Sequence, residues 1–309
     1  MSEWQLKTPV AFIIFNRPDT TERVFSEIAK AKPPKLLVIA DGPRANRPGE
    51  AERCATTRAV IERVDWPCEV LTNFSDVNLG CKGRVSSGID WVFENVEEAI
   101  ILEDDCLPDP SFFRFCEEML GRYRHDQRIG MISGDNFQFG RRHGEDSYYF
   151  SKYVHIWGWA TWRDRWRGAY DVNIELWPMV RDNGRLQDLV FDKDEANYWA
   201  AIFERVHQGG IDTWDYQWVF ANWVEGRLSI LPSVNLISNI GFGVDATHTT
   251  GISPLADLPA EAMQFPLVHP ALRARNGSAD RFSDRVCFRL PLWKRIFGRV
   301  VSKLNRMVA

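Results

Sequence analysis

The chain has 309 residues, 45% of them hydrophobic, and a formal net charge of −4 at pH 7. This length suits one large α/β domain or two small ones, and the charge balance carries no signature of nucleic-acid binding. The N-terminus lacks a signal-peptide core, no stretch is apolar enough to span a bilayer, and the six cysteines lack Cys-x-x-Cys spacing. We therefore expect a cytoplasmic protein with reduced thiols.

The first part of the chain predicts successive strand-helix units. Apolar runs at Val10–Phe15, Leu36–Ala40 and Cys68–Leu71 predict strands, with helices between them. Because the connections are short, we expect these strands to lie in one mostly parallel sheet. Asp41 follows the second strand, and it is either a plain turn residue or a carboxylate placed at a ligand-binding edge.

A glycine-containing segment follows the third strand. Gly80 and Gly83 introduce a helix, with Lys82 and Arg84 near its start. Backbone N–H groups at a helix start favour an anion, so this segment could hold a phosphate or could be a plain solvated helix start. Walker and dinucleotide-binding motifs are absent, which counts against an ATPase and an NAD-binding protein.

An apolar run at 99–102 ends in Glu103, Asp104 and Asp105. The run predicts a buried strand, and the carboxyl ends of such strands are where ligands bind in open α/β sheets. Adjacent carboxylates repel one another, and a divalent cation that also grips a diphosphate would relieve the repulsion. The alternative is a solvated acidic turn.

Aromatic residues dominate the second half of the chain. Nine of the thirteen tryptophans lie between residues 157 and 223. We expect most of them to pack in the core, while some could form platforms for sugar rings. Asp215 lies near the start of a predicted helix, whose dipole would stabilise the ionised carboxylate.

The last part of the chain is expected to be irregular until its end. The glycine-rich segment 239–251 predicts a mobile loop containing His248, which either closes over a ligand or is a plain solvated histidine. Residues 253–277 are proline-rich. The segment 290–309 combines a helical apolar period with five basic and no acidic residues, and it predicts an amphipathic helix that meets an anionic membrane surface, the catalytic domain or a second subunit.

Taken in order, these motifs resemble nucleotide-diphospho-sugar glycosyltransferases of the GT-A fold, most closely the inverting N-acetylglucosaminyltransferase I type. The resemblance runs from about residue 9 to about residue 250. The eukaryotic membrane anchor has no counterpart here and the last sixty residues are unmatched, so a bacterial cytosolic enzyme fits better. The matching motifs are Phe15-Asn16-Arg17, Asp41, Ile101-Leu-Glu-Asp-Asp105, Pro108-Asp-Pro-Ser-Phe-Phe113, Ser133-Gly-Asp-Asn136, Trp157-Gly-Trp-Ala160 and Trp214-Asp215.

The resemblance implies an α/β, Rossmann-like GT-A fold, with a mostly parallel central sheet flanked by helices. It implies a glycosyltransferase domain at 1–252, made of a nucleotide-binding half (1–136) and an acceptor half (137–252). Residues 253–309 would form an irregular C-terminal extension that ends in the amphipathic helix.

The resemblance also implies a role for each motif residue. Arg17 and Asp41 would hold the nucleotide, with Asp41 on the uracil. From their own positions at a helix start and in a glycine-rich loop, Lys82, Arg84 and His248 are candidates for the diphosphate. Glu103 and Asp104 would contact the donor sugar and ribose, and Asp105 would bind Mn²⁺ or Mg²⁺. Trp214 would line the sugar pocket, and Asp215 would be the catalytic base, with Asp212 and Asp135 as rival carboxylates.

The implied activity is inverting transfer of N-acetylglucosamine or a similar hexose from a UDP-sugar to a glycan or lipid-linked acceptor. One alternative is a sugar-nucleotide pyrophosphorylase, against which the absence of glycine between Val10 and Asp19 counts. The other is a non-catalytic sugar-binding module. We expect no nucleic-acid partner, and we expect the 290–309 helix to give peripheral contact with the inner face of the cell membrane or a homodimer.

Overall fold

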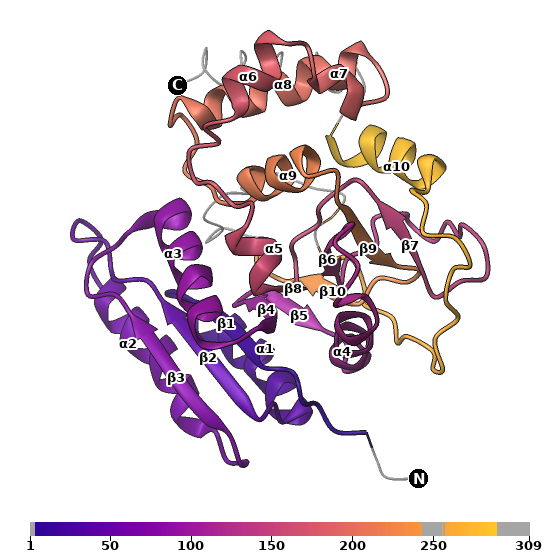
Figure 1. Cartoon of the computed structure of the whole chain (residues 1–309). Helices are drawn as coiled ribbons and strands as arrows, with labels where there is room; N and C mark the ends of the chain where they lie inside the picture. Colours follow the sequence, from indigo (N-terminus) through magenta and orange to yellow (C-terminus); the bar gives the residue numbers. More distant parts are fainter. Residues whose placement is uncertain (1–3, 243–254, 256, 289–309) are drawn as a thin grey trace, which may run out of the picture.

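The structure is a computed structural model that describes residues 4–242, 255 and 257–288. Its centre is an eight-stranded sheet with the order β3-β2-β1-β4-β8-β6-β9-β7 (Figure 1). A second sheet pairs two short antiparallel strands, β5 and β10. The strands are β1 (Val10–Ile14), β2 (Lys35–Ala40), β3 (Glu69–Phe74), β4 (Glu98–Glu103), β5 (Cys106–Pro108), β6 (Ile129–Ser133), β7 (Tyr148–Ser151), β8 (Trp159–Trp162), β9 (Leu228–Pro232) and β10 (Ile237–Asn239).

The first four strands of this order are parallel, as the sequence predicts. β1 pairs with β2 and β4, and β2 pairs with β3. All five residues of β1 are buried, because helices cover both faces of the sheet there. The helices that connect these strands are α1 (Pro18–Ala31), α2 (Glu50–Ala59) and α3 (Gly80–Asn95).

The other half of the sheet is mixed. β8 lies between β4 and β6 and runs antiparallel to both, so that β4 and β6 point in the same direction. β9 is parallel to β6, and β7 is antiparallel to β9 at the outer edge. The carboxyl ends of β1, β2, β4, β6 and β9 therefore meet at one edge of the sheet, which we call the carboxyl edge.

Hydrophobic side chains form two clusters, one on each face of the sheet. The first packs under α1, the turn at Val60 and Ile61, and α4 (Ser111–Tyr123), and α1 contributes Val24, Phe25 and Ile28. The second contains most of the aromatic residues of the second half of the chain. Figure 1 shows α6, α7 and α8 as an outer layer above α9. The helices around this second cluster are α3, α5 (Arg163–Arg167), α6 (Trp177–Asp182), α7 (Leu186–Leu189), α8 (Lys193–His207) and α9 (Asp215–Val224).

The α/β class with a large central sheet flanked by helices is confirmed. Strands β7 and β8 were not predicted, because every residue in them is buried and their sequences show no alternation. The apolar residues at Val234–Ile237 also predict a strand, and the strand found there, β10, begins only at Ile237. A short helix, α10 (Gly277–Ser283), and a π-turn at Asp284–Phe288 end the described chain.

Several expectations concern residues outside the described ones. These are the 290–309 helix and the glycine-rich segment 239–251, including His248 but without its first four residues. All six cysteines lie within the described part and none forms a disulfide. Across residues 4–242 and 257–288, no helix has the length and apolar character needed to cross a membrane.

Candidate active site

Three neighbouring strand ends bring most of the predicted site residues together. In the sheet, Ile14 of β1 is level with Ala40 of β2, and Ile13 is level with Glu103 of β4. Arg17, Asp41 and the carboxylates after β4 consequently lie along the carboxyl edge. This is the edge at which open α/β sheets bind ligands.

Arg17 is paired with two of the three carboxylates. Its guanidinium forms an ion pair with Asp104, and its Nη1 lies 2.9 Å from Oδ2 of Asp105. Asp104 also accepts a hydrogen bond from the backbone N–H of Phe15 over 3.1 Å. Burial raises the pKa of Asp104 to about 6, although Arg17 favours its ionised form. Arg17 thus holds β1 and β4 together at the edge.

Glu103 is left without a compensating charge of its own. Its Oε1 is buried and has no hydrogen-bond partner. Burial raises the pKa of Glu103 to about 8, and repulsion from Asp105 and Asp104 adds to the shift. Three carboxyl groups therefore share the single guanidinium of Arg17, an arrangement that favours binding of an additional cation.

Asp215 joins this cluster from the second half of the chain. It is the first residue of α9, it accepts a hydrogen bond from the Thr213 hydroxyl, and its charge contributes to the raised pKa of Glu103. Cys81 of α3 lies between the two elements. Burial raises the pKa of its thiol, and both Glu103 and Asp215 raise it further. The predicted base therefore lies within electrostatic range of the β4 carboxylates.

Two carboxylates occupy the start of α3, where the sequence suggested a phosphate. Asp41 accepts hydrogen bonds from the backbone N–H groups of Leu79, over 2.9 Å, and Gly80, over 3.1 Å. Asp212 accepts one from the N–H of Lys82 over 2.9 Å. These N–H donors are thus already satisfied by side chains, and the carboxylates take the place of an anionic ligand.

Asp41 has little capacity left for a nucleotide base. Besides Leu79 and Gly80, its carboxylate accepts from Asn78 Nδ2 and from the N–H of Gly42, each over 2.9 Å. Four protein donors fill the four acceptor positions of a carboxylate. Burial raises the pKa of Asp41, and its backbone hydrogen bonds oppose the shift. In this structure Asp41 anchors α3, and contact with uracil stays a prediction.

Arg84 and Trp214 are turned away from the open part of the site. The Nε of Arg84 donates to the carbonyl of Ala40 over 3.1 Å and its Nη2 to Asn73 Oδ1 over 2.8 Å, which ties β2 to β3. Trp214 is 2% exposed and stacks on Trp159 with ring centroids 5.6 Å apart. The expected phosphate contact of Arg84 and sugar contact of Trp214 conflict with this burial, because neither side chain faces open space.

Gly241 presses directly against the carboxylate cluster. The backbone N–H of Ile240 donates to the carbonyl of Asp105 over 2.8 Å. A Cβ at position 241 would lie 2.1 Å from Asp105 Oδ2 and 2.8 Å from Arg17 Nη1. Any other residue here would force the side chain of Asp105 or Arg17 to move. The sequence suggested that this glycine allows loop movement and gave no sign of its contact with Asp105.

The described residues contain no group of three or more His, Cys, Asp or Glu side chains that could hold a metal ion. A cation held by one carboxylate, with diphosphate oxygens and water as its other ligands, needs no such group. Asp105 fits that arrangement, since its side chain is 15% exposed and it shares the single guanidinium of Arg17 with Asp104.

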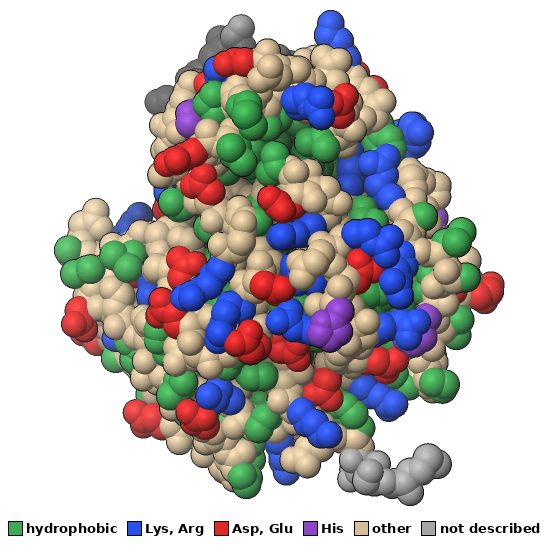
Figure 2. Space-filling model, viewed as in Figure 1, with side chains coloured by type: hydrophobic (Ala, Val, Ile, Leu, Met, Phe, Trp, Pro, Cys, Tyr) green, Lys and Arg blue, Asp and Glu red, His purple; other side chains and the backbone are tan. Residues whose placement is uncertain are grey.

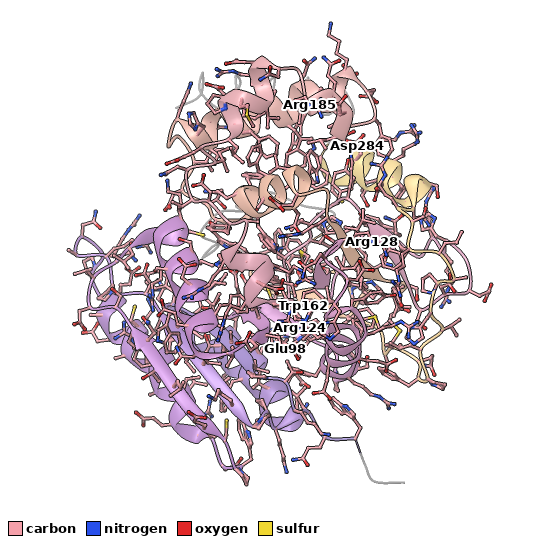
Figure 3. The ribbon with its side chains drawn as sticks, in the orientation of Figure 1. Glu98, Arg124, Arg128, Trp162, Arg185 and Asp284 are labelled. Atoms are coloured by element: carbon pink, nitrogen blue, oxygen red, sulfur yellow. The ribbon has the colours of Figure 1, made fainter. Side chains whose placement is uncertain are left out.

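Charged side chains also lie at the opposite edge of the sheet. Figure 3 shows Glu98, Arg124 and Trp162 close together there, and Glu98 is level with Trp162 in the sheet. Arg124 also lies 2.9 Å from Asp164. Across the face drawn in Figure 2, acidic and basic side chains are interspersed without a large patch of one sign. Arg124 thus has a carboxylate partner at the opposite edge, whereas at the carboxyl edge Asp104 and Asp105 share Arg17.

Known structures resemble the chain only distantly. No protein-family model matches the sequence, and no curated protein does. A UDP-glucose pyrophosphorylase complexed with UDP-glucose is 13% identical, with a TM-score of 0.26 over 47% of this chain and 62% of its own. The galactosyltransferase LgtC, in complex with donor and acceptor sugar analogs, is 12% identical, with a TM-score of 0.34 over 93% of this chain and 99% of its own. At these scores neither similarity bears on the function.

Proposed function

We propose that this chain is a glycosyltransferase that moves a hexose or N-acetylhexosamine from a UDP-sugar to a glycan or lipid-linked acceptor, with inversion of configuration. The observation that carries the proposal is the unbalanced carboxyl cluster at the carboxyl edge. Glu103, Asp104 and Asp105 share one guanidinium there, with Asp215 within electrostatic range. A site with this charge suits a diphosphate that arrives with a divalent cation.

Asp105 would hold the cation, Mn²⁺ or Mg²⁺, which when bound neutralises charge on the leaving diphosphate. Arg17 would bind phosphate oxygens, since its planar guanidinium suits both carboxylate and phosphate. Its contact with Asp105 would then be exchanged for one with the diphosphate. Glu103 and Asp104 would accept hydrogen bonds from donor hydroxyl groups, with Gly241 holding the backbone close above them.

Asp215 would act as the base. As the bond from the anomeric carbon to the acceptor oxygen forms, the bond to the diphosphate oxygen breaks, and the acceptor proton passes to the Asp215 carboxylate. Asp215 belongs to α9 rather than to the β4 edge, and for inversion it would have to lie on the side opposite the leaving group. Attack from that side inverts the configuration.

A donor screen tests the proposal. The full chain with Mn²⁺ is incubated with UDP-, GDP- and TDP-sugars, and release of the nucleoside diphosphate is measured. We expect slow hydrolysis of one UDP-sugar. Release of pyrophosphate from UTP and a sugar 1-phosphate would indicate a pyrophosphorylase instead. Thermal stabilisation by free sugar, without any stabilisation by UDP and Mn²⁺, would indicate a non-catalytic sugar-binding module.

The proposal extends to the division of the chain. Residues 1–136 would bind the nucleotide, residues 137–252 the acceptor, and residues 253–309 would form an extension whose last segment, 290–309, meets a membrane surface. Liposome co-sedimentation of the full chain and of a chain ending at Phe288 tests the last point. Equal pelleting of the two would exclude the membrane role and would favour packing on the enzyme or a homodimer.

A further inference from the structure

Most tryptophans of the second half cannot contact a ligand, because they are buried. Among the described tryptophans, only Trp4, Trp91 and Trp157 are partly open to solvent. Trp4 donates to Glu117 near the N-terminus, and Trp91 lies in the last part of α3, away from its start. Trp157 alone of the three lies at the carboxyl edge, just before β8. The buried ones are Trp66, Trp159, Trp162, Trp166, Trp177, Trp199, Trp214, Trp218 and Trp223.

The backbone at Trp157 is fixed in place. Its N–H donates to Oδ2 of the buried Asp135 over 3.0 Å, and the carbonyl of Gly158 accepts from the N–H of Gly134 over 2.8 Å. Gly158 has φ +67°, and a Cβ there would lie 2.5 Å from Cδ1 of Ile237. The turn therefore fixes the backbone from which the indole projects, at the end of β6, and Asp135 helps to fix it.

Trp157 is part of an aromatic group beside the carboxylate cluster. Its ring contacts Phe242 edge to face, with centroids 5.6 Å apart, and Phe137 at 5.1 Å. Phe242 is half-buried and directly follows Gly241, which contacts both Asp105 and Arg17. We call Trp157 and Phe242 the aromatic platform.

The order of strands places the platform next to the position expected for the diphosphate. Along the carboxyl edge, the sheet presents Arg17 after β1, Asp105 after β4 and Trp157 before β8. If a nucleotide diphosphate binds along the ends of β1 and β4, the sugar attached to its second phosphate would lie toward β8. The acceptor that attacks this sugar would lie there too. The groups at that position in the proposed reaction are the transferred sugar and the acceptor sugar.

We propose that Trp157 and Phe242 form a platform on which the apolar face of a pyranose ring stacks, that ring belonging to the donor or to the acceptor. The inference rests on the proposed function and adds the residues that bind the saccharide. A rigid indole offers a large contact area at low entropic cost, while the nearby carboxylates can accept hydrogen bonds from ring hydroxyls.

The test compares Trp157→Leu and Phe242→Leu with Trp91→Leu, which removes a half-buried tryptophan remote from the site. Calorimetry with Mn²⁺ gives the affinities for UDP and for the UDP-sugar, and kinetics give the acceptor KM. The affinity for UDP should stay within about twofold of wild type. If the stacked ring belongs to the donor, the two substitutions should lower the affinity for the UDP-sugar about fivefold. If it belongs to the acceptor, they should raise the acceptor KM about fivefold. The Trp91 variant should match wild type in all three.

Phenylalanine fills most of the space of the indole, so Trp157→Phe should change the UDP-sugar affinity or the acceptor KM by an intermediate amount. This variant replaces Trp157→Leu in the test if Trp157→Leu does not fold. Folded variants with unchanged UDP-sugar affinity and acceptor KM would overturn the platform. If wild type binds no nucleotide, the proposed function fails, and saturation-transfer NMR with methyl hexopyranosides then decides the platform. Signals lost in the Trp157 variants but kept in Trp91→Leu would uphold it, and equal signals would overturn it.

Discussion

Arg17 and Asp105 are joined by an ion pair of 2.9 Å, so the carboxylate proposed to bind a cation already has a cationic partner from the neighbouring strand. A metal ion has to compete with this guanidinium. Competition should be easier when a diphosphate offers Arg17 an alternative partner. We therefore expect Mn²⁺ and UDP to bind cooperatively, each increasing the affinity for the other.

Asp105→Asn should abolish this cooperativity. In wild type we expect Mn²⁺ to raise the affinity for UDP about tenfold or more, and in the variant we expect no increase. Calorimetric titration of UDP with and without Mn²⁺ measures the effect. Asp19→Asn, which removes an exposed carboxylate two residues from Arg17, is the control and should behave as wild type. An undiminished Mn²⁺ effect in Asp105→Asn would remove Asp105 from the metal site.

Asp215→Asn should keep the binding of UDP and Mn²⁺ but slow sugar transfer by about 10²-fold or more, because an amide cannot take the acceptor proton. Asp212→Asn is the matched control. Its side-chain oxygen can still accept from the N–H of Lys82, so transfer should change little. The reverse result, with slow transfer only in Asp212→Asn, would assign the base to Asp212. Retention of the donor's anomeric configuration would exclude direct displacement.

Gly241→Ala should impair the site without unfolding the protein. The added Cβ would overlap Asp105 Oδ2, at 2.1 Å, and would have to move the side chain of Asp105 or Arg17. We expect turnover to fall on the order of tenfold or more. Gly121→Ala is the control, since nothing lies within 4 Å of a Cβ at that helical position. That change should raise stability by about 0.5–1 kcal/mol. Normal turnover in Gly241→Ala would contradict the close approach.

Glu103 should make stability depend on pH. Burial raises its pKa from 4.5 to about 8, so the folded protein keeps a proton that the unfolded chain releases. The free energy of unfolding should therefore fall as pH rises from about 5 to about 8. Asp104, with its pKa raised to about 6, adds to the fall in the same direction.

Glu103→Gln should flatten this pH profile, because the amide has no proton to lose. Between pH 5 and pH 8, the free energy of unfolding should fall by about 1 kcal/mol or more less in the variant than in wild type. Urea unfolding at both pH values measures the difference. Parallel profiles for the two proteins would show that Glu103 is ionised at neutral pH in the folded state.

Asp41→Asn should act on stability more than on nucleotide binding. The amide cannot accept at both of its side-chain atoms, so part of the capping of α3 by Asp41 is lost. We expect the free energy of unfolding to fall by about 1–2 kcal/mol. The affinity for UDP should change less than about threefold. A large loss of UDP affinity at normal stability would support the uracil contact that the family resemblance implies.

The part of the site that sequence predicted consists of residues adjacent to recognisable strands. Apolar runs before Glu103 and Asp41 identify strand ends, and parallel strands necessarily bring those ends to one edge. The partners of these residues could not be predicted, because they come from distant segments. Asp41 bonds to Leu79 and Gly80, and nothing in the local sequence distinguishes that cap from a nucleotide contact.

The sequence also could not predict which tryptophans are exposed to solvent. Trp157 and Trp214 both occur in dense aromatic stretches, yet only Trp157 reaches the carboxyl edge with part of its ring open. Strand β8 illustrates the same limit, since its buried residues show neither a period of two nor one of 3.6. Tertiary packing decides which aromatic residues face solvent, and a linear pattern does not encode it.

The place of β8 in the sheet limits how this chain can be recombined. Residues 159–162 supply the strand between β4 and β6, which both precede residue 136. In a chimera of two related proteins joined at residue 136, β4 and β6 would come from one parent and β8 from the other. The pairing of Glu98–Ile101 with Trp159–Trp162 would then have to form between sequences of different origin. Strands β9 and β10 lie beyond β8 and also pair with N-terminal strands, β6 and β5. Chimeras should therefore take every strand of the two sheets from one parent and change only segments between them, such as residues 163–227.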